Sequence, residues 1–318
     1  MNVKLYITID TEEDNWDGYA PTDNPVNNIL ALPKLQRLFD QFGAVPTYLV
    51  SYPVVTNDVS FDVLKEIMSS GRCELGAHCH PWNTPPFLEK ISVSNSMLCN
   101  LSADLIEKKI SILHQEIVNR FGVTPKSFRS GRWAFNGKVA QALINNGYKI
   151  DTSITPFTNW GKYAGPDFSR ASAEAYSFDS SNIFTARDDG LLLEIPPTVG
   201  FLQKHQKTCA GIRNWIIDNG IDRYRLLGVL DKFKMVNYRW LSPELNDGPG
   251  MISLAKSFIR NGHRFLNMSF HSTTLLPGCT PFVKSEDDLQ NFLHDIEIFL
   301  EFCANQELEF QPLHAALG

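Results

Sequence analysis

The sequence predicts a single α/β domain, residues 1–318, built as a closed or nearly closed barrel of parallel strands. Short apolar, β-rich runs alternate with segments of helical hydrophobic spacing over most of the chain. No internal repeat or linker divides it. Polar side chains recur where the expected strands end, which is where α/β barrels place their chemistry. Together these observations favour an enzyme.

The first half of the chain is expected to alternate strands with helices. Serines 60 and 102 are the expected N-caps of two helices, and glycines 43, 71, 122 and 147 mark helix ends. The expected strands are 5–10, 45–50, 73–80, 127–129 and 148–153, and the expected helices are 28–42, 60–70, 102–121 and 137–146.

The second half is less regular. Residues 155–190 are rich in Pro and Gly and are expected to form an irregular excursion over the sheet rather than a linker. A helical segment is expected at 206–234 and a loop at 243–250. The remaining expected elements are strands at 191–196, 264–270 and 308–313 and helices at 251–261 and 285–303.

Composition excludes several classes of protein. With 43% hydrophobic and 20% charged residues, the chain is an ordinary globular protein. Its net charge of −6 and lack of a Lys/Arg block argue against a nucleic-acid partner. The apolar run at residues 5–9 is too short for a signal peptide or a spanning helix. The six scattered cysteines are typical of reduced thiols, so we expect a cytoplasmic location.

Two histidines two residues apart end the third expected strand. Because residues i and i+2 of a strand share a face, the His78 and His80 imidazoles can converge on one point, while Cys79 faces away. Asp10 and Glu12 leave the first strand with the same spacing. Two histidines and a carboxylate with open positions are typical of a catalytic zinc or other divalent transition metal ion, so Glu12, His78 and His80 are the predicted ligands.

The remaining strand-end residues supply the predicted proton transfers. Asp10 is the expected base, and Arg129 can pair with it and lower its pKa. His271 can protonate the leaving group. A bound divalent ion would activate water against a carbonyl carbon, so the expected reaction is hydrolysis.

Six further residues at these strand ends are the candidates for substrate binding. Alternatives stay open for most of them: the tryptophans can be packing residues, Arg132 a surface ion-pair partner, Asp151 a turn cap and Glu194 an ordinary strand end. The candidates are Trp82, Asn83, Arg132, Trp133, Asp151 and Glu194.

Five motifs, in order, resemble those of the polysaccharide deacetylases, carbohydrate esterase family 4 with the NodB-homology fold. They are Thr8–Glu12, His78–His80, Phe128–Arg132, Asp151 and Leu266–His271, and the resemblance spans residues 5–271. It implies a distorted (β/α)7 barrel. It also implies Asp10 as catalytic base, Glu12 as metal ligand, Arg129 as the partner of the base, and His271 as general acid.

This sequence departs from the family pattern in two motifs. The first motif usually has adjacent aspartates, whereas Thr11 intervenes here, so Glu12, Glu13 or Asp14 could be the acidic ligand. The second usually separates its histidines by three residues, whereas position 82 is Trp and the second histidine is His80. Residues 76–86 and 271–278 look like a cytoplasmic subgroup associated with surface-polysaccharide synthesis, such as lipopolysaccharide or capsule.

The resemblance therefore implies a metal-dependent deacetylase that needs one divalent ion, most simply zinc. The expected substrate is an amino sugar that carries an N-acetyl or other N-acyl group on a nucleotide- or lipid-linked intermediate. Two alternatives remain: an allantoinase-like hydrolase of a non-sugar amide, and a catalytically inactive carbohydrate-binding module on the same fold.

Overall fold

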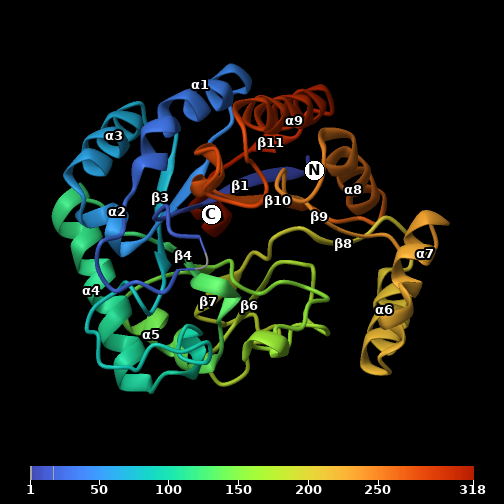
Figure 1. The fold of residues 1–318 in the computed structure, drawn as a ribbon, viewed down its shortest axis with the longest axis horizontal. Coiled ribbons are helices and arrows are strands. Elements are labelled where there is room, and N and C mark those ends of the chain that lie inside the picture. Colours follow the sequence, from blue (N-terminus) through green and yellow to red (C-terminus); the bar gives the residue numbers. More distant parts are fainter. Residues whose placement is uncertain (1, 17) are drawn as a thin grey trace.

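A computed structural model describes residues 2–16 and 18–318 and has a curled sheet at its centre with helices around it (Figure 1). Within this described part, the main sheet has nine strands in the order β10-β1-β2-β3-β4-β5-β7-β6, with β11 beside β1. Neighbouring strands are parallel except β6 and β7. The predicted α/β barrel-type fold is confirmed.

The strands of the main sheet are β1 (Lys4–Thr11), β2 (Thr47–Val50), β3 (Glu74–Cys79), β4 (Ser127–Ser130), β5 (Ile150–Asp151), β6 (Tyr176–Phe178), β7 (Leu192–Glu194), β10 (Phe265–His271) and β11 (Glu309–Phe310). A separate ribbon pairs β8 (Val199–Phe201) with β9 (Tyr238–Trp240). The α-helices are α1 (Leu32–Phe42), α2 (Tyr52–Thr56), α3 (Asp58–Ser69), α4 (Ala103–Phe121), α5 (Gly137–Asn145), α6 (Gln206–Asp218), α7 (Leu226–Lys232), α8 (Gly248–Arg260) and α9 (Glu286–Asn305).

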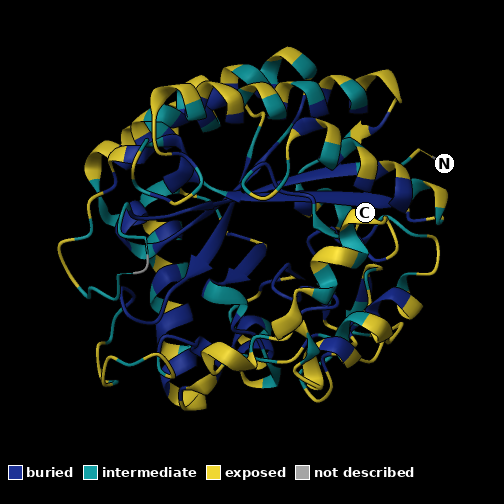
Figure 2. Cartoon of the chain, turned by 45° about the vertical axis from the view of Figure 1, so that its right-hand side comes forward, coloured by how far each residue is buried: buried dark blue, intermediate teal, exposed yellow. Residues whose placement is uncertain are grey.

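The central strands are buried on both faces, whereas the helices bury only their inner side. Every residue of β2, β3 and β4 is buried, as Figure 2 shows for the dark blue sheet. Strands buried on both faces are typically apolar runs without alternation, and such a run predicted β2.

The sheet does not close into a complete barrel, because its two edge strands, β10 and β6, do not pair within the described residues. Extended segments next to β8 and β9 cross the gap beside β10. Thr198 N–H donates to the Asn267 carbonyl at 2.9 Å, Leu241 N–H donates to the Thr198 carbonyl at 2.8 Å, and Ser269 N–H donates to the Leu241 carbonyl at 3.0 Å. These hydrogen bonds join the irregular segments beside β8 and β9 to the edge strand β10.

Several local expectations need correction. Asn57, not Ser60, caps α3: its side chain accepts a hydrogen bond from Ser60 N–H. The excursion at 155–190 contains β6, which pairs with β7. The expected loop 243–250 ends early, because Asp247 caps α8 with an acceptor for Gly250 N–H.

Other expectations hold. Ser102 caps α4, Ser285 caps α9 through a capping box, and residues 206–234 are mostly helical, in α6 and α7. All six cysteine thiols are free. Among the helices of residues 2–16 and 18–318, none is long and apolar enough to cross a membrane.

Candidate active site

Sheet register brings the predicted site residues together at the carboxyl ends of four strands. Asp10 of β1 is the register partner of His271 of β10, and His78 of β3 is the register partner of Arg129 of β4. His80 follows β3 by one residue. Parallel strands end at the same edge of the sheet, so side chains distant in sequence face one space.

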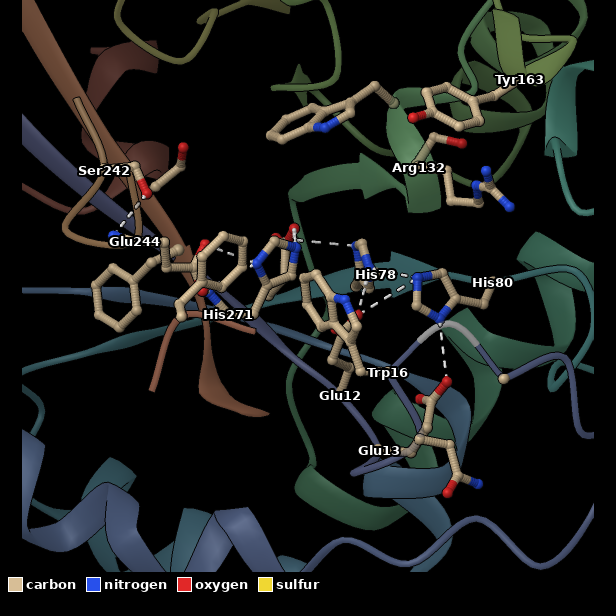
Figure 3. Close-up of a pocket in the computed structure, with 18 of the residues that line it drawn as sticks. Glu12, Glu13, Trp16, His78, His80, Arg132, Tyr163, Ser242, Glu244 and His271 are labelled. Carbon is tan, nitrogen blue, oxygen red and sulfur yellow. Dashed lines mark hydrogen bonds and ion pairs between the residues drawn. The ribbon is translucent and has the colours of Figure 1, made fainter. Parts of the chain in front are cut away.

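Glu12, His78 and His80 direct one ligand atom each toward a common point (Figure 3). His78 Nε2 lies 3.0 Å from His80 Nε2. Glu12 Oε2 lies 3.2 Å from the first nitrogen and 3.4 Å from the second. Ligands about 2.1 Å from a tetrahedral zinc ion stand about 3.4 Å apart, so these spacings fit a divalent cation.

Hydrogen bonds show which ring nitrogen of each histidine has a free lone pair for a cation. His78 Nδ1 lies 3.2 Å from the Arg129 carbonyl oxygen, which can only accept, so Nδ1 carries the proton. His80 Nδ1 lies 3.2 Å from Glu13 Oε1, a carboxylate oxygen that also accepts, so this Nδ1 carries a proton as well. Both Nε2 atoms then present lone pairs to each other, an arrangement that a cation between them stabilises.

The three acids after β1 have different surroundings. Glu12 faces the histidines, whereas Glu13 lies behind His80 and accepts hydrogen bonds from Asn83 Nδ2 at 2.6 Å and Ser51 Oγ at 3.2 Å. Asp14 accepts from the backbone N–H groups of residues 27 and 28. Of the three acids left open by the sequence, Glu12 is the one in the cluster.

His80 is confined by two neighbours. The Trp82 ring stacks on it, with centroids 4.1 Å apart and an interplanar angle of 21°. Gly131 lies against it too, and a Cβ there would come within 1.9 Å of His80 Cδ2. Burial lowers the pKa of His80, but the Glu13 carboxylate and its acidic neighbours outweigh burial and raise the pKa. The acidic residues around His80 therefore favour a positive charge at the point where Glu12, His78 and His80 meet.

Asp10 is buried and paired with a buried arginine. Arg129 Nη1 donates to Asp10 Oδ1 at 2.7 Å, while the same guanidinium donates to Thr8 Oγ1 at 2.7 Å and the Thr152 carbonyl at 3.0 Å. Burial raises the pKa of Asp10, but the charges of Arg129, His78 and His271 outweigh burial and hold the pKa below its usual value. Asp10 is therefore ionised and able to accept a proton.

His271 has a partner that the sequence did not indicate. Its Nδ1 lies 3.0 Å from Glu244 Oε2, and its Nε2 lies 3.6 Å from Asp10 Oδ2. Burial lowers the pKa of His271, but the Glu244 carboxylate outweighs burial, and the pKa rises to about 10. Glu244 lies in the expected loop 243–250, where no pattern distinguished it from a solvated acid.

A cavity of about 640 Å³ lies at these residues, with a largely aromatic wall. Trp16 packs edge-on against His271 at 4.9 Å between ring centroids. Flat apolar faces with a few directed polar groups suit sugar rings. The sequence indicated Trp82 and Trp133, but most of the wall comes from loops without periodic pattern. The aromatic lining residues are Trp16, Tyr19, Trp82, Trp133, Trp160, Tyr163, Trp240, Phe270 and Phe282.

Arg132 and Trp133 reach this wall through an unusual turn. Both have left-handed backbone, with φ of 55° and 60°. Such conformations are uncommon for non-glycine residues and concentrate at functional sites. Arg132 Nη1 donates to Ser96 Oγ at 2.9 Å and also contacts the Tyr19 hydroxyl.

Three of the six predicted substrate-binding residues do not line the cavity. Asn83 is buried and donates to Glu13. Asp151 and Glu194 are register partners with no exposed surface, below the site in the strands β5 and β7. The predicted contact of these three residues with substrate has to be revised. Asn83 holds the Glu13 side chain, while Asp151 and Glu194 accept hydrogen bonds from the backbone N–H groups of Ser153 and Ile154. Trp82, Arg132 and Trp133 do line the cavity.

Comparisons with solved structures identify proteins of the same fold. A candidate polysaccharide deacetylase from Mycobacterium smegmatis matches with a TM-score of 0.55 and 13% identity, over 99% of this chain and 90% of that one. A candidate glycoside hydrolase or deacetylase from Parabacteroides distasonis matches with a TM-score of 0.60 and 9% identity, over 98% and 70%. No protein-family model matches the chain, and no curated protein does. The distorted deacetylase-type barrel is therefore the fold of this chain.

Proposed function

We propose that this protein is a metal-dependent hydrolase that removes an N-acetyl, or another N-acyl, group from an amino sugar. One observation supports it above the others. Two imidazole lone pairs and the Glu12 carboxylate meet at one point, beside an ionised Asp10 and a protonated His271. Metal, base and acid would thus share one aromatic cavity.

Glu12, His78 and His80 would hold the ion, and zinc suits this donor set of two imidazoles and a carboxylate. When bound, a divalent ion polarises the amide carbonyl and makes water more acidic. The inner shell is supported by Glu13 and the Arg129 carbonyl, which fix the two imidazole tautomers.

The chain's own residues then move the protons. Asp10 Oδ1 is occupied by Arg129, so Oδ2 would take the proton from the attacking water. His271 keeps its proton at neutral pH because Glu244 accepts from Nδ1, and its Nε2–H would protonate the departing amine nitrogen. The two groups differ in charge because one faces a guanidinium and the other a carboxylate.

The proposed substrate is a nucleotide- or lipid-linked amino sugar of surface-polysaccharide synthesis, met in the cytoplasm. Arg132 is the reason to propose an anionic phosphate group near the sugar, because its guanidinium is a cationic group that lines the cavity. An inactive module is less favoured, because His80 Nε2 faces His78 and Glu12 rather than the core.

The test begins with metal analysis of chelator-free protein and mass spectrometry of candidate acylated amino sugars and, for the non-sugar alternative, ureides. A loss of about 42 Da identifies acetyl and about 28 Da identifies formyl, as expected for amide hydrolysis. Asp10→Asn and His271→Ala are each expected to lower turnover by roughly two or more orders of magnitude. The metal content of both variants should match that of wild type.

Exposed residues of the same type provide controls: Asp104→Asn and His294→Ala, at side chains 77% and 66% exposed, should keep wild-type turnover. Wild-type turnover in both site variants would contradict the assignment. Glycan binding without bound metal or product would indicate the inactive module.

A further inference from the structure

Residues 204–239 form a helical hairpin that stands out from the side of the barrel (Figure 1). It consists of α6, a short 3-10 turn at Ile221–Tyr224, and α7, and it joins the barrel through the β8–β9 ribbon. On its inner side, Cys209, Ala210 and Val236 pack in a small cluster with Phe157 and Phe201. The outer side of both helices therefore faces away from the protein's core.

This hairpin exposes an unusual amount of apolar surface. Trp215 is 60% exposed, Tyr224 69% and Phe233 70%. Helical spacing places Trp215 beside Ile212 and Phe233 beside Val229, so each helix has an apolar stripe on its outer side. Seven exposed large apolar residues of the described chain lie here: Ile212, Trp215, Ile217, Tyr224, Val229, Phe233 and Met235.

The hairpin is also cationic, although the whole chain carries a net charge of −6. Its exposed acids are Asp218 and Asp222, while Asp231 is paired with Arg239 at 2.7 Å. The exposed basic residues of the hairpin are Lys204, Lys207, Arg223, Arg225, Lys232 and Lys234.

We propose that the hairpin docks on the surface of an anionic lipid bilayer. Trp and Tyr with flanking Lys and Arg are the residues that prefer the membrane interface, where apolar burial and attraction to anionic headgroups add. Charge favours this occupant over a second copy, because two cationic hairpins would repel each other. The hairpin lies outside the cavity, so docking on a bilayer is separate from the proposed function.

Vesicle sedimentation with the full chain tests the proposal. We expect binding to vesicles of phosphatidylcholine mixed with phosphatidylglycerol, weak binding to phosphatidylcholine alone, and weaker binding as salt increases. Trp215→Ser/Phe233→Ser and Lys232→Glu/Lys234→Glu are each expected to reduce affinity about tenfold.

Matched controls change the same residue classes elsewhere. Leu30→Ser/Val59→Ser removes apolar side chains that are 59% and 55% exposed, and Lys34→Glu/Lys65→Glu reverses exposed charges on α1 and α3. Both should bind like wild type. Circular dichroism should show all variants folded, and turnover of a water-soluble substrate reports separately on the proposed function.

Three outcomes would overturn the proposal: no binding to the anionic vesicles, equal binding to neutral ones, or hairpin variants that bind like wild type. Sedimentation velocity can give a fourth outcome that would overturn the proposal. A dimer that Trp215→Ser/Phe233→Ser abolishes would assign the surface to a second copy of the chain.

Discussion

The Glu244 side chain determines both the orientation and the charge of His271. Its carboxylate accepts from His271 Nδ1 and from the His271 backbone N–H, and it also accepts from Thr274 Oγ1 at 2.6 Å. A loop residue thus fixes a strand-end imidazole with its Nε2 toward Asp10. Positioned in this way, the imidazole can act as an acid at neutral pH.

Glu244→Gln should move the alkaline limb of the pH–rate profile to lower pH. His271 must be protonated to act as an acid, so activity is lost as pH rises through its pKa, which is about 10 with Glu244 present. Removing the carboxylate lowers that pKa by about 1–3 units. The profile of turnover against pH measures the shift, while metal content should not change.

Glu297→Gln is the control for Glu244, because it removes another His–Glu pair, His294–Glu297, on the exposed side of α9. Its profile should match wild type. An alkaline limb that stays in place in Glu244→Gln would show that another group donates the proton.

A substitution at Gly131 tests whether His80 is a metal ligand. A Cβ at this position would lie 1.9 Å from His80 Cδ2 and 2.7 Å from Nε2, and the stacked Trp82 ring prevents the imidazole from moving away. Gly131→Ala should therefore displace Nε2 and weaken zinc binding about 10–100-fold, as measured by competition with a chromophoric chelator. Gly211→Ala, where nothing lies within 4 Å, should leave affinity unchanged. Unchanged affinity in Gly131→Ala would remove His80 from the ligand set.

At the scale of elements, β5 and β7 are joined below the site by two buried acids. Asp151 and Glu194 are register partners, and neither has exposed surface. Burial raises the pKa of Asp151 to about 6, and burial together with the Asp151 charge raises the pKa of Glu194 well above its usual value. Glu194 Oε1 accepts from Ile154 N–H, so a proton on Oε2 can be shared with Asp151.

Glu194→Gln should make stability less dependent on pH. An acid whose pKa is raised on folding contributes fully below its unfolded pKa, and this contribution is lost as pH rises toward the folded pKa. Glutamine keeps an acceptor for Ile154 and a donor for Asp151 without titrating. We expect similar unfolding free energies at about pH 4, and a variant more stable by roughly 1–3 kcal/mol at about pH 8.

Urea unfolding across this pH range measures the unfolding free energies of wild type and variant. The exposed Glu301→Gln on α9 should follow the wild-type curve. A Glu194→Gln variant that loses stability with pH as wild type does would exclude the shared proton.

Among the individual elements, the long amphipathic helices could be predicted, whereas the β8–β9 ribbon could not. α4 and α9 are amphipathic over many turns and have Ser caps, so their pattern was sufficient. β8 and β9 have three residues each, and their pairing depends on tertiary contacts with β10 rather than on local sequence. Short strands such as β2 and β7 lie in apolar runs and were predicted, so the ribbon was missed because it depends on tertiary contacts rather than because it is short.

Only part of the candidate site could be predicted from the sequence. Strand ends placed Asp10, His78, Arg129 and His271 at one edge once a parallel sheet was inferred, so that geometry followed from the sequence. Glu244 and most of the aromatic wall lie in loops, whose positions no periodic pattern specifies. Asp151 and Glu194 have strand-end positions too, but the sequence does not show that both are too deep to meet a ligand.

Metal binding should stabilise the molecule as a whole, because its proposed ligands join β1 to the end of β3 across β2. An ion that binds only the folded chain adds about 2.7 kcal/mol at 100 times its Kd. Zinc should therefore raise the wild-type Tm by a few degrees, and EDTA should reverse the rise. His78→Ala should abolish most of the rise, and Asp10→Asn should retain it. The free thiols are the same in all three proteins, so an equal rise in His78→Ala would place the bound zinc elsewhere.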